Sequence, residues 1–214
     1  MQLINTIEID PFDFSDKEYN YPGGSSDERN QFWKQCISDK NLGRLEAIRK
    51  GSYLVDITTI NEEELAAIIK HKLKEADLWD FEEQVSQIAG GVALRENDTI
   101  YIEPSCCGDM GSLKEWESIF EMELNKWHQL WIGHPWVYYR RGQGVIEFSN
   151  YTEASPEDFK AIEILVVVSE LELQMELKKI SAQQNDFEDS IRRILDKMGV
   201  ANAERIAKLM TGNV

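Results

Sequence analysis

The feature that most constrains the fold is the stretch over residues 99–151, which holds four of the six tryptophans of this 214-residue chain. In its second half, three segments alternate apolar and polar residues like β-strands, and two turn sequences separate them. The turns are Gly133-His134-Pro135 and Arg141-Gly142-Gln143-Gly144, and the expected strands are 127–133, 136–140 and 144–151. The pattern predicts a three-stranded antiparallel meander. Alternation places Trp136, Tyr138 and Arg140 on one face, opposite Val137 and Tyr139.

The N-terminal part is expected to mix helices and strands. Asp27 is expected to cap a helix whose apolar face includes Cys36, and Asn61 and Ser112 each precede a glutamate at capping-box spacing. Periodicity indicates further elements. They are a strand over 1–10, an irregular segment over 11–27, a helix around 42–48, a strand over 52–58, a helix over 79–88 and a hairpin over 92–103.

The C-terminal part is predicted to be helical. Ser155-Pro156-Glu157-Asp158 carries strong helix-start signals, so the segment from there to about Gln184 is expected to be one long helix, although residues 171–177 also alternate like a strand. Two short helices are expected over 186–198 and 202–210. The fold class is therefore α+β, with a mostly antiparallel sheet, a tryptophan-rich meander, flanking helices and a helical C-terminus.

Two domain organisations fit this pattern. One is an α+β domain over 1–183 with a C-terminal helical extension over 184–214 packed on it. The other is one single domain over 1–214.

The charge balance narrows the class of partner. Thirty-nine acidic residues against 23 basic ones give a formal net charge of −16, which disfavours nucleic acid and anionic membrane because both repel an acidic surface. A basic protein partner is favoured. The longest apolar run, residues 164–168, is far shorter than the about 20 residues of a membrane span, and residues 1–14 do not resemble a signal peptide. Three cysteines make no disulfide framework, so a cytoplasmic protein is expected.

Metal binding and thiol chemistry are alternatives around residues 105–134. Cys106, Cys107, Asp109, His128 and His134 are all ligand-capable, but adjacent cysteines are poor partners for one zinc ion. A cysteine just before a helix N-terminus, with a histidine nearby, is also a conceivable nucleophile. Turn and core roles explain the same residues, so we assign no catalytic residue, no metal ligand and no cofactor.

Recognition of a protein partner is the remaining role for the aromatic stretch. Tryptophan, tyrosine and arginine are enriched at the centres of protein interfaces. The candidate partner-binding residues are Asp109, His134, Trp136, Tyr138, Arg140 and Arg141. At least half of the tryptophans are expected to be largely buried instead, because a meander covered by helices needs large apolar groups.

At PSCCGDMGSLKEW and LWIGHPWVYYR the chain resembles uncharacterised bacterial proteins found among toxin–immunity systems. The order of helices, tryptophan-rich meander and helix is also similar to the SUKH class of immunity proteins. The resemblance covers roughly residues 92–170 and carries over no site residue, and the long C-terminal helical part departs from the compact SUKH plan. The resemblance implies a cytosolic protein that binds and neutralises a toxin.

The function expected from the sequence is that of a non-enzymatic, acidic binding protein. Its most concrete form is an immunity protein that occludes a basic bacterial toxin. One alternative is a thiol- or metal-dependent enzyme that uses Cys106, Cys107 and His134. The other is an assembly protein that oligomerises through its C-terminal helices.

Overall fold

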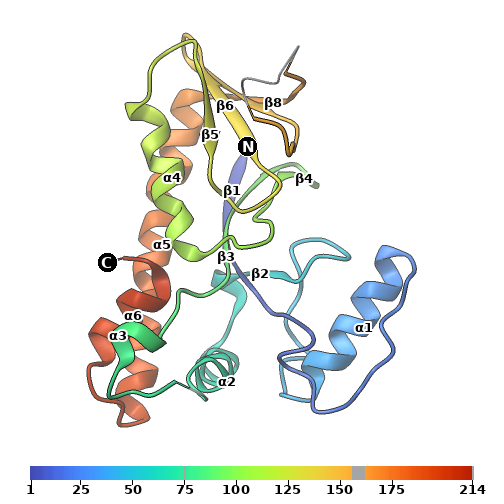
Figure 1. The fold of residues 1–214 in the computed structure, drawn as a ribbon, viewed down its shortest axis with the longest axis vertical. Coiled ribbons are helices and arrows are strands. Elements are labelled where there is room, and N and C mark those ends of the chain that lie inside the picture. Colours follow the sequence, from blue (N-terminus) through green and yellow to red (C-terminus); the bar gives the residue numbers. More distant parts are fainter. Residues whose placement is uncertain (75, 156–161, 214) are drawn as a thin grey trace. The chain divides into compact units, whose positions relative to one another are not determined.

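The strands that the structure describes form two antiparallel four-stranded sheets, which confirms the α+β fold class. A computed structural model describes residues 1–74, 76–155 and 162–213 (Figure 1). Within these ranges the strand orders are β2-β1-β3-β4 and β5-β6-β7-β8. The predicted meander is present as β5 (Trp127–Leu130), β6 (Val137–Arg141) and β7 (Val145–Ser149).

The chain divides into two compact units. The first, called here the meander unit, comprises Met1–Asn5 and Ala89–Gln184. The second, called the helical unit, comprises Thr6–Ile88 and Asn185–Val214. The domain boundary predicted near residue 184 stays a prediction.

The meander unit begins with the start of β1 (Gln2–Glu8) and continues with the predicted hairpin, β3 (Gly90–Glu96) and β4 (Thr99–Ile102). Asn97 makes its turn with a φ of 54°, a left-handed conformation that asparagine tolerates well. A short helical region follows, made of η2 (Met110–Ser112), α4 (Leu113–Ser118) and η3 (Ile119–Glu121).

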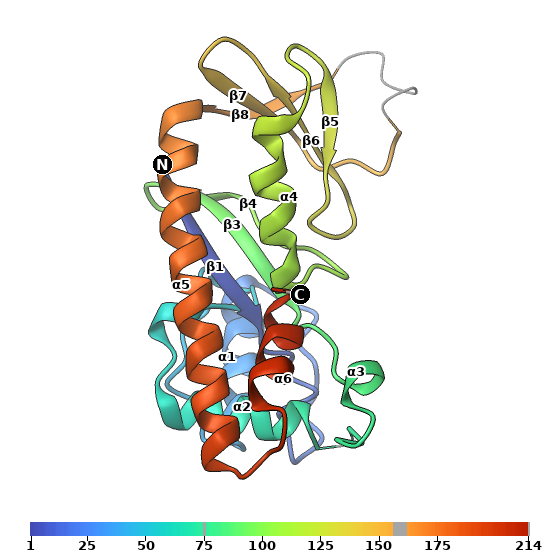
Figure 2. The ribbon, with the colours of Figure 1, turned by 90° about the vertical axis from the view of Figure 1, so that its left-hand side faces the viewer.

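The core of the meander unit joins strands from both sheets to α4 and the start of α5. The Trp116 ring of α4 lies 5.6 Å from the Phe148 ring of β7, and Figure 2 shows α4 running beside this sheet. Val137 and Tyr139 of β6 point into the same core, as the alternation predicted. Trp116 is fully buried, whereas Trp127 and Trp136 are half-buried and Trp131 is exposed. Three of the four tryptophans of the stretch therefore have most of their surface buried, which agrees with the expectation that at least half would be largely buried.

The single long helix predicted from Ser155 to Gln184 is wrong. Ile164–Ser169 is a strand, β8, and helix α5 (Glu170–Lys197) begins only after it. The start signal over residues 156–158 lies outside the described residues. The physical reason is that Ile164 and Val166 to Val168 are β-branched and pair antiparallel with β7, from Ile164 opposite Ser149 to Ser169 opposite Val145. Helix α5 then runs without a break through 184–186, where a new helix was expected.

The helical unit contains α1 (Ser26–Ser38), β2 (Leu54–Asp56), η1 (Ile57–Thr59), α2 (Glu62–Lys72), α3 (Phe81–Gln84) and α6 (Ala203–Thr211). The Asn61–Glu64 capping box is confirmed. The expected cap of α1 is corrected from Asp27 to Ser25, which forms a reciprocal capping box with Glu28. Cys36 lies on the buried face of α1, as expected.

Two other predicted helices of this unit are not formed as expected. The segment 42–48 makes a turn, in which the Leu45 amide donates to the Leu42 carbonyl, and then a backbone bridge between Ala47 and Val55. It does not continue as a helix because the Ile48 amide donates to the Leu54 carbonyl of β2, at 2.9 Å. Only Phe81–Gln84 is helical within 79–88. None of the described helices is both long enough and apolar enough to cross a membrane.

Candidate functional site

Cys106 and His134, which the thiol- or metal-dependent alternative invoked, are brought together by two facing loops of the meander unit. The His134 amide donates to the Cys106 carbonyl at 2.9 Å, and the Ser105 amide donates to the Ile132 carbonyl at 3.0 Å. Gly133 has a φ of 104°, and a Cβ there would lie 2.4 Å from the Cys106 carbonyl oxygen. Only glycine permits this approach, so the Gly-His-Pro turn fixes the position of the cysteine loop.

The side chains of the two cysteines of this loop are exposed. Their sulfur atoms lie 3.4 Å apart, and Cys107 has a left-handed φ of 69°. The His134 ring is also exposed and stands edge-on to Trp136, at 5.1 Å between centroids. Among the described residues, no group of three or more histidine, cysteine, aspartate or glutamate side chains is arranged to hold a metal ion. The arrangement presents two thiols and an imidazole to solvent.

Asp109 has a structural role in the same loop. Its carboxylate accepts a hydrogen bond from the Gly111 amide at 2.8 Å and caps η2. Burial raises the pKa of this carboxyl, while hydrogen bonds from the Gly111 and Ser112 amides act in the opposite direction. The Ser112 capping box predicted for α4 is not formed, because Asp109 provides the cap one turn earlier.

The predicted site residue Tyr138 lies inside the protein, with 1% of its surface exposed. Its hydroxyl donates to the Ala154 carbonyl at 3.3 Å, and burial raises its pKa. Trp136 is half-buried, and its backbone exchanges two hydrogen bonds of 2.9 Å with Thr152. The chain around 152–154 therefore covers this face of β6.

The two arginines at the end of β6 are engaged differently. Arg140 lies over the Trp127 ring at 4.9 Å and pairs with Glu147 across the sheet at 2.6 Å. Arg141 points to the opposite face and is more deeply buried. It donates to the Phe120 carbonyl at 2.5 Å and pairs with Glu170 at 2.7 Å. Arg141 thus ties η3 to the start of α5, whereas Arg140 is accessible to a partner on one side.

The helical unit contains a pocket that the sequence did not reveal. It has a volume of about 410 Å³ and is lined by residues of the connection between β1 and α1 and by residues of α1 itself. Its lining residues are Phe12, Ser15, Lys17, Glu18, Tyr19, Asn20, Phe32 and Cys36. Three of them are apolar side chains that form its floor and one wall, and the other five are polar or charged.

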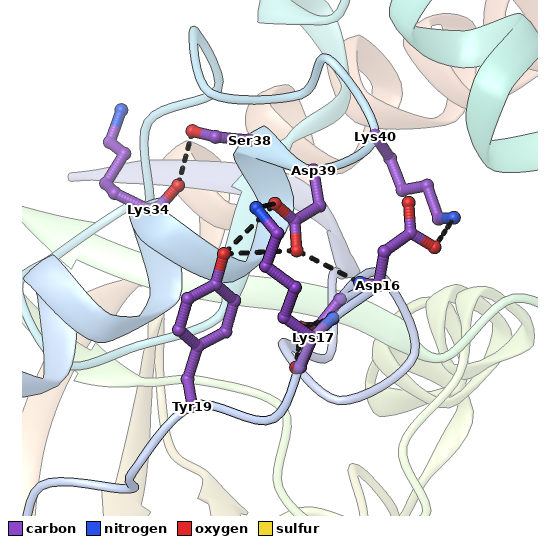
Figure 3. Close-up of polar contacts among 8 residues, drawn as sticks. Asp16, Lys17, Tyr19, Lys34, Ser38, Asp39 and Lys40 are labelled. Atoms are coloured by element: carbon purple, nitrogen blue, oxygen red, sulfur yellow. Dashed lines mark hydrogen bonds and ion pairs between the residues drawn. The ribbon is translucent and has the colours of Figure 1, made fainter.

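A polar cluster centred on Asp39 holds the connection in place beside the pocket (Figure 3). The Tyr19 hydroxyl donates to both oxygens of the Asp39 carboxylate, at 3.0 and 3.2 Å, and the Asp16 amide donates to it at 3.0 Å. The Lys17 ammonium lies 3.6 Å away, and Lys40 pairs with Asp16. Burial alone would raise the pKa of Asp39, but these donors and the lysine charge outweigh it and hold the pKa below its usual value.

Aromatic rings gather at the mouth of the pocket. The Phe12 side chain is 63% exposed although its ring lies 5.7 Å from that of Phe32. Tyr21, also exposed, stands edge-on to Phe32 at 5.3 Å. The sequence signal that could have indicated this site is the alternation of rings and acids over residues 10–21, DPFDFSDKEYNY, which loop composition alone does not require.

No known protein family, curated protein or solved structure matches this chain. The fold and the two sites therefore define its class by themselves. It is an acidic α+β protein that exposes a thiol–imidazole loop in one unit and an aromatic pocket with acidic neighbours in the other.

Proposed function

We propose that this chain is a non-enzymatic binding protein that recognises a basic protein. Its most concrete form is a bacterial immunity protein that acts in the cytoplasm and neutralises a toxin by occlusion. Acidic side chains would match the basic rim of the toxin's active site, and exposed rings would anchor the centre of the interface.

The observation that carries the proposal is the distribution of charge. The meander unit holds 16 acidic and 8 basic residues and the helical unit 23 and 15, so each has a formal charge of −8. Some basic side chains are engaged in contacts within the protein. Arg141 and Lys34 each donate to backbone carbonyls and pair with a glutamate. The excess carboxylates therefore face the solvent, where complementary charge accelerates association with a basic protein.

The part of the predicted surface that suits an interface is the turn at Trp131 and His134. Trp131 is 46% exposed, and the His134 ring is exposed beside the half-buried Trp136. Exposed rings on a loop fixed by backbone hydrogen bonds lose little entropy on binding, which favours their use as anchors.

The proposal is tested with proteins encoded beside the gene of this chain. Each is titrated into the full-length chain by calorimetry at low and high salt, and each toxic one is co-expressed with the chain to measure protection. We expect one neighbour to bind with salt-dependent affinity and to lose its toxicity. Cytochrome c is the control for non-specific basic binding. The proposal fails if no neighbour binds, or if cytochrome c binds as tightly as the best neighbour.

A second candidate function is thiol-dependent catalysis, which the exposed Cys106 and Cys107 next to His134 favour. Profiling of thiol reactivity against pH, with elemental analysis of the purified protein, separates it from binding. Ordinary thiol reactivity and absence of bound metal would remove its support.

Assembly through α5 is the third candidate. Leu171 and Met175 lie one turn apart on this helix and are 66% and 63% exposed. Light scattering of the full chain and of a Leu171→Glu, Met175→Glu variant tests it. A monomer mass in both samples would end this reading.

A further inference from the structure

The pocket of the helical unit has the size and lining of a ligand site. Its volume of about 410 Å³ falls within the roughly 300–1,000 Å³ of typical binding pockets. Phe32 and Cys36, both buried, form an apolar floor, and the exposed Phe12 ring forms a wall. The apolar floor suits the hydrocarbon stem of a long side chain, and the exposed Phe12 ring leaves an aromatic face in water on which a planar cation can stack.

The electrostatic environment of this pocket is negative. Residues 8–20 contain five carboxylates and one lysine, and the exposed Glu18 lines the pocket directly. Burial, and then the charges of Asp39 and Asp10, raise the pKa of the Cys36 thiol at the floor. The two aspartates therefore act on the interior of the pocket itself.

The lysines nearby do not cancel this charge. The Lys17 ammonium is directed to Asp39, at 3.6 Å, and Lys40 is paired with Asp16 (Figure 3). Each lysine thus offsets one carboxylate of the cluster. Excess negative charge remains on Glu18, which lines the pocket together with Phe12, and on Asp10, whose carboxylate accepts a hydrogen bond from the Phe12 amide at 2.8 Å.

We propose that this pocket binds an arginine side chain presented by a basic polypeptide. The aliphatic stem lies on Phe32 and Cys36, and the guanidinium group stacks on the Phe12 ring and pairs with Glu18. Arginine suits the site because its planar cation stacks on aromatic faces, binds carboxylates and is more weakly hydrated than an ammonium group. The inference rests on the proposed function in one respect: the polypeptide that presents the arginine is taken to be the basic partner proposed above.

The pocket is tested with a peptide probe and the full-length, ¹⁵N-labelled chain. Acetyl-Gly-Arg-Gly-amide is titrated while amide resonances are followed, and the same peptides with citrulline or lysine in place of arginine are the controls. We expect saturable shifts confined to residues 10–21 and 32–39, with the neutral citrulline peptide at least about tenfold weaker. Absence of shifts, shifts spread over other acidic segments, or equal binding of the citrulline peptide would each overturn the inference. Tighter binding of lysine than of arginine would overturn the assignment of arginine.

Two variants with matched controls locate the contact. Phe12→Ala and Glu18→Gln are expected to weaken the arginine peptide by about tenfold and about threefold, respectively. Both side chains are exposed, and we therefore expect both variants to keep the fold. Unchanged amide resonances outside the pocket check this. Trp79→Ala, which removes a ring that is 98% exposed in the same unit, and Glu83→Gln are expected to leave affinity unchanged. Equal effects of the pocket variants and their controls would contradict the proposal.

The failure of this inference is distinguishable from failure of the proposed function. If a neighbouring toxin binds and Phe12→Ala leaves its affinity unchanged, the assignment of this pocket to the partner is wrong and the proposed function stands. If the arginine peptide binds at the pocket and no neighbour binds the chain, the proposed function is wrong and the pocket assignment stands.

Discussion

The hydroxyl of Tyr19 donates to the Asp39 carboxylate and so joins an irregular loop to the C-terminal end of α1. Asp39 is the C-cap residue of this helix, where a negative charge is unfavourable to the helix dipole. Three groups of the loop that lines the pocket offset this unfavourable charge: the Asp16 amide, the Lys17 ammonium and the Tyr19 hydroxyl. The loop that lines the pocket is therefore held to α1 by donors to the Asp39 carboxylate.

The first prediction concerns this carboxylate and pH. Folding lowers the pKa of Asp39 from its ordinary value of 3.8. The ionised carboxylate therefore stabilises the fold at pH values above the unfolded-state pKa, and this stabilisation is lost as the pH falls through the lower pKa of the folded state. Asp39→Asn is expected to lower the thermal unfolding midpoint at about pH 7, and the difference from the parent is expected to shrink below about pH 3.8. Glu83→Gln, at an exposed carboxylate, is the control and should change neither. A deficit of Asp39→Asn that is the same at all pH values would contradict the role of its charge.

Glu8 on β1 is predicted to behave in the opposite way. Burial and the charges of Asp10 and Asp13 raise its pKa above 4.5, although Lys72 opposes them. The Glu8 carboxyl therefore binds its proton more tightly in the folded state than in the unfolded state. The protonated carboxyl contributes stability below the unfolded-state pKa, and this contribution is lost as the pH rises through the folded-state pKa. Glu8→Gln is expected to raise the unfolding midpoint at about pH 7 and to have little effect below about pH 4.5. Carboxyl NMR titration gives an independent check, because Asp10→Asn should lower the Glu8 pKa; an unchanged value would refute the assigned cause.

Neighbouring arginines are predicted to differ in their contribution to stability. Arg141→Ala removes the partly buried hydrogen bond to the Phe120 carbonyl, the partly buried pair with Glu170 and an exposed hydrogen bond to the Met122 carbonyl, and is expected to cost about 2–3 kcal/mol. Arg140→Ala removes a more exposed pair with Glu147 and is expected to cost under about 1 kcal/mol. Urea unfolding of both variants measures the contrast, and equal losses would show that burial does not decide the difference.

Local patterns predicted the elements that local interactions determine. The meander follows from alternation and two turns, and the Asn61 capping box follows from a four-residue pattern. The strand β8 was mistaken for helix because apolar residues at 159, 162, 165 and 168 also fit a helical period. Only pairing with β7 decides between the two, and a single sequence does not contain that pairing.

The candidate sites were predictable to different degrees. The sequence placed Cys106 and His134 in turns but did not show that backbone bonds join those turns. Tyr138 was expected to be on an accessible face, and residues 152–154 cover it. The pocket was not predicted, because Tyr19 and Asp39 are 20 residues apart and their contact depends on how an irregular loop folds back on α1.

The three cysteines are predicted to react in two classes. Cys106 and Cys107 are exposed, whereas Cys36 is buried and its pKa is raised, first by that burial. Since the thiolate is the reactive form, Ellman's reagent is expected to modify two thiols of the native chain quickly and the third only at the rate of unfolding. Cys106→Ser and Cys107→Ser should each remove one fast equivalent, and Cys36→Ser should remove the slow one. A fast third equivalent in the native parent would contradict the burial of the Cys36 thiol, and a single fast equivalent would contradict the exposure of Cys106 or Cys107.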